Sequence, residues 1–118
     1  MKILYYEPEK DIGILYSNFL REKEFVVDTV GTKREAMAKI KSEKYDLMIM
    51  DVNDSTGNDF IEEIKGEKIP VIFTTASVLD FSEYEIPTLY KPFESNELLD
   101  LVCLKLRDGE KALILYPY

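Results

Sequence analysis

Five short apolar runs, separated by longer segments of helical periodicity, limit most strongly what this chain can fold into. Within the longer segments, apolar residues recur three and four positions apart, as in amphipathic helices. Such alternation is typical of βα units, which assemble into a parallel sheet with helices on both faces. We therefore predict a doubly wound α/β domain whose five strands lie at 3–6, 25–30, 47–50, 71–73 and 86–90.

Three details of the helical segments follow from individual residues. Thr32, followed three positions later by Glu35, forms a capping box that predicts the start of a helix ending near Glu43. Cys103, the only cysteine, lies in a helical pattern, so we expect a buried thiol that forms no internal disulfide. The first helix is expected to bury one apolar stripe, formed by Ile12, Leu15, Tyr16, Phe19 and Leu20.

Length, charge and the lack of histidine exclude several classes of protein. With 118 residues the chain fits one domain, so we expect any output to pass to a separate protein or to a second copy of the chain. A formal net charge of −8 disfavours nucleic acid and anionic membranes as partners. No apolar stretch approaches the roughly 20 residues that span a bilayer and no signal sequence is visible, so we expect a cytoplasmic protein. Without histidine, imidazole-based nucleophile pairs, histidine metal sites and phosphohistidine carriers are excluded.

Polar side chains follow four of the expected strands at the point where each strand ends. They are Glu7, Asp51, Thr75 and Lys91. The carboxyl ends of parallel strands lie at one edge of the sheet, and ligands of open α/β sheets bind outside that edge. A carboxylate that ends an apolar run is costly unless it meets water, a cation or hydrogen-bond donors. We therefore interpret these residues as a candidate site.

The segments around these residues read Met-Lys-Ile-Leu-Tyr-Tyr-Glu7, Asp-Leu-Met-Ile-Met-Asp51, Ile-Pro-Val-Ile-Phe-Thr-Thr75-Ala76 and Tyr-Lys91-Pro92-Phe93. In this order they resemble receiver domains of two-component signalling. Each motif alone is weak, but four in the right order on the right elements are specific. The resemblance implies a flavodoxin-like sheet with strand order 2-1-3-4-5 and a receiver domain at residues 1–108.

The resemblance also implies a role for each site residue. Asp51 would accept a phosphoryl group from a phosphohistidine on a sensor histidine kinase or a phosphotransfer protein, and signalling would follow through protein contact rather than enzymatic turnover. Lys91 would pair with Asp51, Thr75 would hydrogen-bond the phosphoryl group, and the Lys91-Pro92 peptide would be cis. The chemistry agrees, because phosphoryl transfer to a carboxylate needs positive charge at the phosphoryl oxygens, which lysine and Mg²⁺ can supply.

One departure from the family pattern affects the metal site. Receivers usually carry two adjacent acids after the first strand, the second of them a direct metal ligand, whereas this chain has Glu7-Pro8. Proline has no acidic oxygen, so two carboxylates remain to face Lys91. We therefore expect Mg²⁺ binding to be weak or absent, with Glu7, Asp51 and Asn53 as the candidate ligands.

Further departures concern the loop after Asp51 and the switch surface. Ser55 stands where proline is usual in the family, and Asp59 where glycine is common. Thr88 occupies the position of the aromatic switch residue, although Tyr90 lies two residues on and is expected to face the same side. We therefore expect a differently set loop and assign Thr88 and Tyr90 to the switch surface.

The connection before the fifth strand is too short for an ordinary crossover helix. Residues 77–87 must supply it, and Pro87 limits any helix there. We therefore expect the fourth helix to be shortened or missing, which alters the surface that reports phosphorylation in receivers. The tail 109–118 is apolar, and we keep three readings of it open: an added strand at a sheet edge, a homodimer contact or a disordered end.

Three functions compete on this sequence. The leading hypothesis is a phosphoacceptor receiver in a phosphorelay, built on Asp51. The alternative is a pseudo-receiver, a protein-interaction module that works without phosphorylation, which Pro8 and the short crossover favour. A phosphohydrolase of the haloacid-dehalogenase type is disfavoured, because Asn53 stands where that family has its general-acid aspartate.

Overall fold

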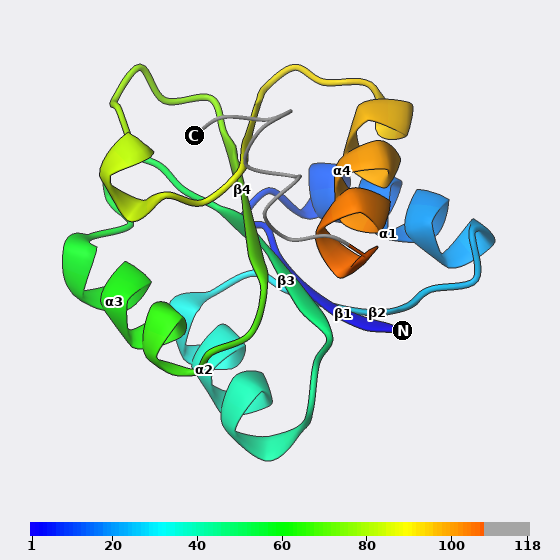
Figure 1. Ribbon diagram of the computed structural model, residues 1–118, viewed down its shortest axis with the longest axis horizontal. Coiled ribbons are helices and arrows are strands. Elements are labelled where there is room, and N and C mark those ends of the chain that lie inside the picture. Colours follow the sequence, from blue (N-terminus) through cyan, green and yellow to red (C-terminus); the bar gives the residue numbers. More distant parts are fainter. Residues whose placement is uncertain (108–118) are drawn as a thin grey trace.

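The computed structural model describes residues 1–107 and shows a parallel sheet between two pairs of helices (Figure 1). The strands pair in the order β2-β1-β3-β4-β5, which confirms the predicted topology. They are β1 (Lys2–Tyr6), β2 (Val26–Val30), β3 (Leu47–Asp51), β4 (Val71–Thr75) and β5 (Thr88–Tyr90). The helices are α1 (Lys10–Glu22), α2 (Lys33–Ser42), α3 (Asn58–Gly66) and α4 (Ser95–Arg107), with one 3₁₀ turn, η1 (Ser82–Tyr84).

Each face of the sheet carries its own apolar core. Helices α1 and α4 cover one face and α2 and α3 the other (Figure 1). All five residues of β3 are buried, as expected of a central parallel strand with helices on both sides. Because β3 is fixed from both faces, its carboxyl end holds Asp51 at a defined place.

The start of α2 follows the prediction from the capping box. Thr32 is the N-cap, and its hydroxyl accepts a hydrogen bond from the backbone N–H of Glu35 at 3.1 Å. The Glu35 carboxylate in turn accepts from the backbone N–H of Gly31 at 3.3 Å. The bond to Thr32 satisfies one backbone donor that the first turn of a helix leaves free, and the bond to Glu35 satisfies the donor of the residue before the N-cap.

The buried face of α1 differs from the predicted apolar stripe. Gly13, Ser17 and Leu20 are its buried residues, whereas Leu15 is 58% exposed, so that part of the prediction was wrong. A Cβ atom at Gly13 would lie only 3.2 Å from the Thr29 methyl group, and Ser17 hydrogen-bonds the Thr29 hydroxyl at 2.6 Å. The small side chains therefore bring α1 close to β2, and they turn Leu15 toward solvent.

The crossover between β4 and β5 contains no α-helix, which confirms the predicted loss of the fourth helix. Only η1 interrupts it. Phe81 and Tyr84 pack edge-on against Phe73 of β4, with ring centroids 6.2 and 6.1 Å apart. The Tyr84 hydroxyl also hydrogen-bonds Asn58 Oδ1 at the start of α3. Aromatic side chains thus cover the part of the sheet that a helix would otherwise cover.

Cys103 is exposed on α4, so the expectation of a buried thiol was wrong. The buried residues of α4 are Leu98, Leu101, Val102 and Leu104, and position 103 falls outside that stripe.

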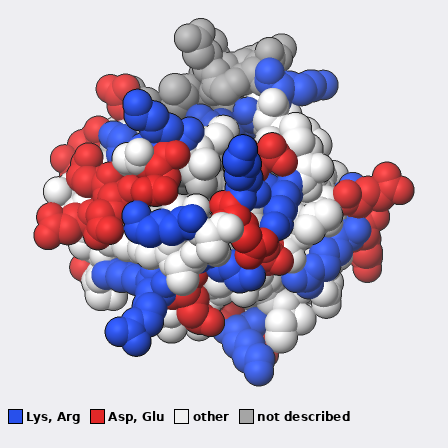
Figure 2. All heavy atoms as spheres, turned by 90° about the horizontal axis from the view of Figure 1, so that it is seen from below, with Lys and Arg blue, Asp and Glu red and all other residues white. Residues whose placement is uncertain are grey.

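Among residues 1–107, no helix is long and apolar enough to cross a membrane. On the face in Figure 2, basic and acidic side chains are interspersed, so that face offers no continuous basic surface. The alternatives for the tail 109–118 lie outside the described residues.

Candidate functional site

The carboxyl ends of β1, β3 and β5 bring three of the predicted site residues together. Lys91 Nζ donates hydrogen bonds to Glu7 Oε1 at 2.7 Å and to Asp51 Oδ1 at 2.8 Å. Both carboxylates are buried, with Glu7 2% and Asp51 5% exposed. Residues 84 and 40 positions apart along the chain therefore form one ion-paired group, as predicted from their strand-end positions.

The charges of this group support one another. Burial raises the pKa of Glu7, although the hydrogen bonds from Lys91 and from the backbone N–H of Glu9 oppose that rise. Burial alone would lower the pKa of Lys91, but the hydrogen bonds to Asp51 and Glu7 outweigh it and raise the pKa. Lys91 therefore stays cationic at neutral pH. Such a buried group of charges is stable only while each charge keeps its partner.

The loop after Asp51 places an amide on the second carboxylate oxygen. Asn53 Nδ2 donates to Asp51 Oδ2 at 3.2 Å. Asn53 Oδ1 accepts from the backbone N–H of Ser55 at 2.8 Å, and Thr56 Oγ1 accepts from the backbone N–H of Asn53 at 2.8 Å. Gly57, at φ +83°, lets the chain turn into α3. Both oxygens of Asp51 thus face cationic or polar donors.

Thr75 lies beside this group without contacting Asp51. Its hydroxyl is buried, donates to the Val52 carbonyl oxygen at 2.6 Å and accepts from the backbone N–H of Ser77 at 3.0 Å. Asp51 is paired with Thr74 in the sheet, and successive strand residues point to opposite faces, so the Thr75 side chain points to the other face. Its predicted bond to a phosphoryl group stays a prediction.

A hollow of about 430 Å³ opens from the acceptor group to solvent. Pro8 forms part of its wall, beside Glu7. Glu9 and Asp54 also line it, but no three of the acidic side chains in residues 1–107 come close enough together to form a metal-binding cluster. Within the described residues, Asp51 Oδ1 accepts a hydrogen bond from Lys91 Nζ and Asp51 Oδ2 accepts one from Asn53 Nδ2.

The remaining predicted residues lie on β5 and just after it. Thr88 is 5% exposed, and its hydroxyl donates to the Ile86 carbonyl oxygen at 3.0 Å. Tyr90 is 53% exposed, and its partner in the sheet is Thr75, as Phe73 is the partner of Thr88. The Lys91-Pro92 peptide is cis, as predicted. The switch roles of Thr88 and Tyr90 stay predictions.

Two contacts of the site were missed by the sequence reasoning. Ser77 Oγ donates to Asp54 Oδ1 at 2.5 Å and so connects the loop after β4 with the loop after β3. Lys33 Nζ donates to the Ser55 carbonyl oxygen at 3.0 Å and connects α2 with that same loop. No motif marks either contact. Only the strand order, which places the loops after β3 and β4 side by side, offered a signal for the first.

Fold and site together define a flavodoxin-like α/β domain with an aspartate and a lysine paired at the carboxyl edge of its sheet. The family model of the response regulator receiver domain matches residues 3–103. The chain therefore belongs to the response regulator receiver domain family.

Individual relatives agree with this assignment. Sensory transduction protein LytR of Staphylococcus haemolyticus (strain JCSC1435) is 38% identical over 77 residues, which are 58% of this chain and only 30% of that protein. A two-component response regulator from Clostridium difficile superposes with a TM-score of 0.81 at 26% identity, covering 92% of this chain and 98% of that one. TrrA from Thermotoga maritima, solved in complex with Mg²⁺-BeF, gives 0.75 at 29% identity, with 89% and 97% covered.

Proposed function

We propose that this domain accepts a phosphoryl group on Asp51 and passes the signal on by protein contact. One observation carries the proposal: the Lys91 ammonium lies 2.8 Å from Asp51 Oδ1 at the base of a hollow that opens to solvent. A carboxylate that served only to stabilise the fold would not need an open approach. The donor would be a phosphohistidine of a sensor histidine kinase or a phosphotransfer protein, and the receiver of the signal a separate protein.

The residues present account for the transfer step. An oxygen of Asp51 attacks phosphorus, the bond from phosphorus to the donor imidazole nitrogen breaks, and the electron pair leaves with that nitrogen. Negative charge gathers on the phosphoryl oxygens, and Lys91 is placed to offset it. Asn53 Nδ2 keeps the other oxygen of Asp51 in place. The domain acts as an acceptor in this scheme and not as an enzyme that turns over a substrate.

Mg²⁺ has a smaller part in this proposal than in most receivers. It would be held by Glu7, Asp51 and Asn53, but Pro8 offers no ligand and Lys91 already donates a hydrogen bond to each carboxylate. Since Mg²⁺ requires near-ideal octahedral oxygen coordination and dehydrates reluctantly, it gains little from a site with so few free oxygens. We therefore propose that Mg²⁺ binds weakly here.

Phosphorylation by a small-molecule donor tests the proposal. Purified protein would be incubated with acetyl phosphate and Mg²⁺ beside a receiver domain known to react, and the intact mass would be measured. The proposal predicts a gain of one phosphoryl group in the wild type and none in Asp51→Asn. If the control domain reacts and this protein does not, phosphotransfer to Asp51 is refuted.

A pseudo-receiver is the second candidate, and two observations favour it. Lys91 satisfies both buried carboxylates without any metal ion, and the crossover that normally holds the fourth helix is reduced to η1. A pseudo-receiver would signal through its surface alone. An NMR titration with Mg²⁺ separates the candidates, because saturable shifts of Glu7 and Asp51 signals argue against a pseudo-receiver, whereas unchanged signals together with absent phosphorylation support one.

A further inference from the structure

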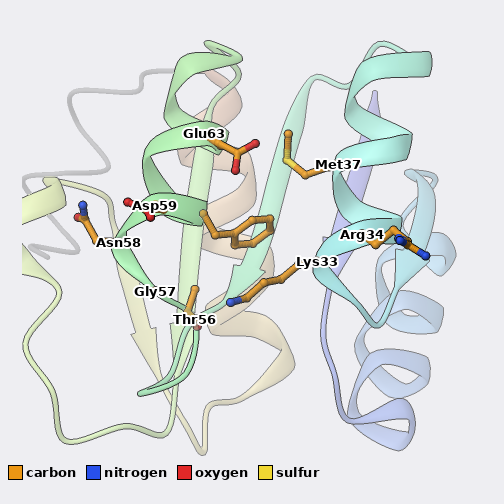
Figure 3. A pocket seen from close by; sticks show the side chains of 9 residues that line it. Lys33, Arg34, Met37, Thr56, Gly57, Asn58, Asp59 and Glu63 are labelled. Atoms are coloured by element: carbon orange, nitrogen blue, oxygen red, sulfur yellow. The ribbon is translucent and has the colours of Figure 1, made fainter.

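A lysine on α2 reaches the loop that follows the acceptor strand. Lys33 lies in the first turn of α2, and its Nζ donates a hydrogen bond of 3.0 Å to the Ser55 carbonyl oxygen. The same ammonium lies 5.5 Å from the ring centroid of Phe60 on α3. Figure 3 shows the Lys33 side chain extended across the hollow between α2 and α3 toward Thr56 and Gly57. Two helices and the loop thus meet at one cation.

The residues of the loop that Lys33 contacts are hydrogen-bonded to one another. Asn53 Oδ1 accepts from the backbone N–H and from the hydroxyl of Ser55, at 2.8 and 2.7 Å. Asn53 and Thr56 exchange two further hydrogen bonds, from Asn53 N to Thr56 Oγ1 at 2.8 Å and from Thr56 N to the Asn53 carbonyl oxygen at 3.0 Å. Displacing Ser55 therefore displaces the Asn53 side chain as well.

The path from α2 ends on the acceptor itself. Lys33 bonds the carbonyl of Ser55, the backbone N–H of Ser55 bonds the Asn53 side chain, and Asn53 Nδ2 bonds Asp51 Oδ2. Because Lys91 bonds the opposite oxygen at 2.8 Å, Lys91 and the Asn53 amide together fix how the Asp51 carboxylate is rotated. A carboxylate that is already oriented loses less freedom on reaching the geometry of attack.

We propose that Lys33 is a positioning residue for Asp51, acting through Ser55 and Asn53. The effect on phosphorylation rests on the proposed phosphoacceptor function, whereas the effect on Asn53 does not. Lys33 is exposed, so its hydrogen bond is weakened by water and the effect on rate is modest. Loss of the Lys33 ammonium should slow phosphorylation by acetyl phosphate about threefold.

Arg34 provides the matched control. It carries the same charge one position along the same helix and lines the same hollow of about 660 Å³. Figure 3 shows its guanidinium directed away from the loop. A general electrostatic effect of α2 on the acceptor would change with either residue, whereas positioning through the Ser55 carbonyl would change with Lys33 alone.

NMR of the full chain tests the proposal without any need for phosphorylation. The side-chain amide signals of Asn53 would be identified by their loss in Asn53→Ala and then followed in Lys33→Met, Lys33→Arg and Arg34→Met. Lys33→Met should move these signals, Arg34→Met should leave them in place, and Lys33→Arg should retain most of the wild-type position because arginine can still donate to Ser55.

Acetyl phosphate labelling of the same variants gives the second measurement. The expected order of rates is wild type and Arg34→Met together, Lys33→Arg close behind, and Lys33→Met slowest. Equal positions of the Asn53 signals in Lys33→Met and Arg34→Met would overturn the positioning role. If the signals move as expected but no variant is labelled, Lys33 positions Asn53 and the phosphoacceptor function itself is wrong.

Discussion

The acceptor end of the sheet and the crossover from β4 to β5 have been shaped by different constraints. At the acceptor end, Glu7, Asp51 and Lys91 meet within hydrogen-bond distance because the strand register fixes where each strand ends. In the crossover, two aromatic rings and a 3₁₀ turn stand in place of a helix, and the strand order is unchanged. The chemistry of this fold depends on strand ends, whereas a connection only needs to span the strands and cover the sheet.

The energetic demands of the two regions differ in the same way. Buried charges at the acceptor end must each keep a partner, because an unpaired charge in a protein interior is very costly. The crossover instead requires buried apolar area, which different side chains can supply. We therefore expect single substitutions to destabilise the protein in two ways. At the acceptor end they leave a buried charge without its partner, and in the crossover they create a cavity.

The largest effect is expected in the crossover, from Tyr84→Ala. The change removes a buried ring from Phe73 and a hydrogen bond to Asn58, so unfolding free energy should fall by about 4 kcal/mol. Urea unfolding followed by circular dichroism measures it. Val78→Ala in the same crossover is the control, since Val78 is 99% exposed and should leave the midpoint unchanged. If Tyr84→Ala and Val78→Ala changed the urea midpoint equally, the side chains of η1 would not stabilise the sheet in place of a helix.

Lys91→Met tests the pairing at the acceptor end. It leaves the buried carboxylates of Glu7 and Asp51 without their common cation, and we expect a loss of about 3 kcal/mol in unfolding free energy. Lys39→Met breaks an exposed pair with Glu43 and should leave the urea midpoint close to wild type. A wild-type midpoint in Lys91→Met would mean that the carboxylates find other partners.

Tyr5→Phe addresses a buried hydroxyl below the acceptor. Among the described residues, the Tyr5 hydroxyl has no hydrogen-bond partner, and burial followed by the nearby Glu7 charge raises its pKa, so it stays neutral. Removing it should stabilise the protein by about 1 kcal/mol. Tyr45→Phe is the opposite case, because its hydroxyl donates to Asp28 at 2.6 Å, and it should destabilise by about 1 kcal/mol. Differential scanning calorimetry should give shifts of opposite sign.

The smallest effect concerns pH and Glu7. Burial raises the pKa of Glu7 above its ordinary value of 4.5, so the folded state binds the proton more tightly than the unfolded state does. Its contribution to stability is complete below pH 4.5 and is lost as pH rises through the folded pKa. Glu7→Gln should therefore gain stability relative to wild type between pH 4.5 and neutrality, as measured by urea unfolding. A constant difference across that range would contradict the raised pKa, and Glu9→Gln serves as the charge control.

The sequence predicted where the strands end, but it did not predict the contacts of the loops or the rotation of α1. The ends of the apolar runs located Asp51 and Lys91, because the period of two and the parallel pairing leave little freedom in a central sheet. The exposure of Leu15 could not be predicted in this way, because Gly13 and Ser17 let α1 approach the sheet and rotate. The bonds of Thr75 to Val52 and of Lys33 to Ser55 depend on loop conformation, which no periodicity encodes.

Beryllofluoride, a mimic of the phosphoryl group, offers the most direct test of the acceptor site. Two-dimensional NMR spectra of the wild type and of Asp51→Asn would be recorded with and without beryllofluoride and Mg²⁺. The account predicts that wild-type signals of Asp51, Asn53 and Lys91 shift together on saturation, and that the variant does not respond. Identical spectra of the wild type with and without the mimic, at concentrations that saturate a known receiver, would contradict it.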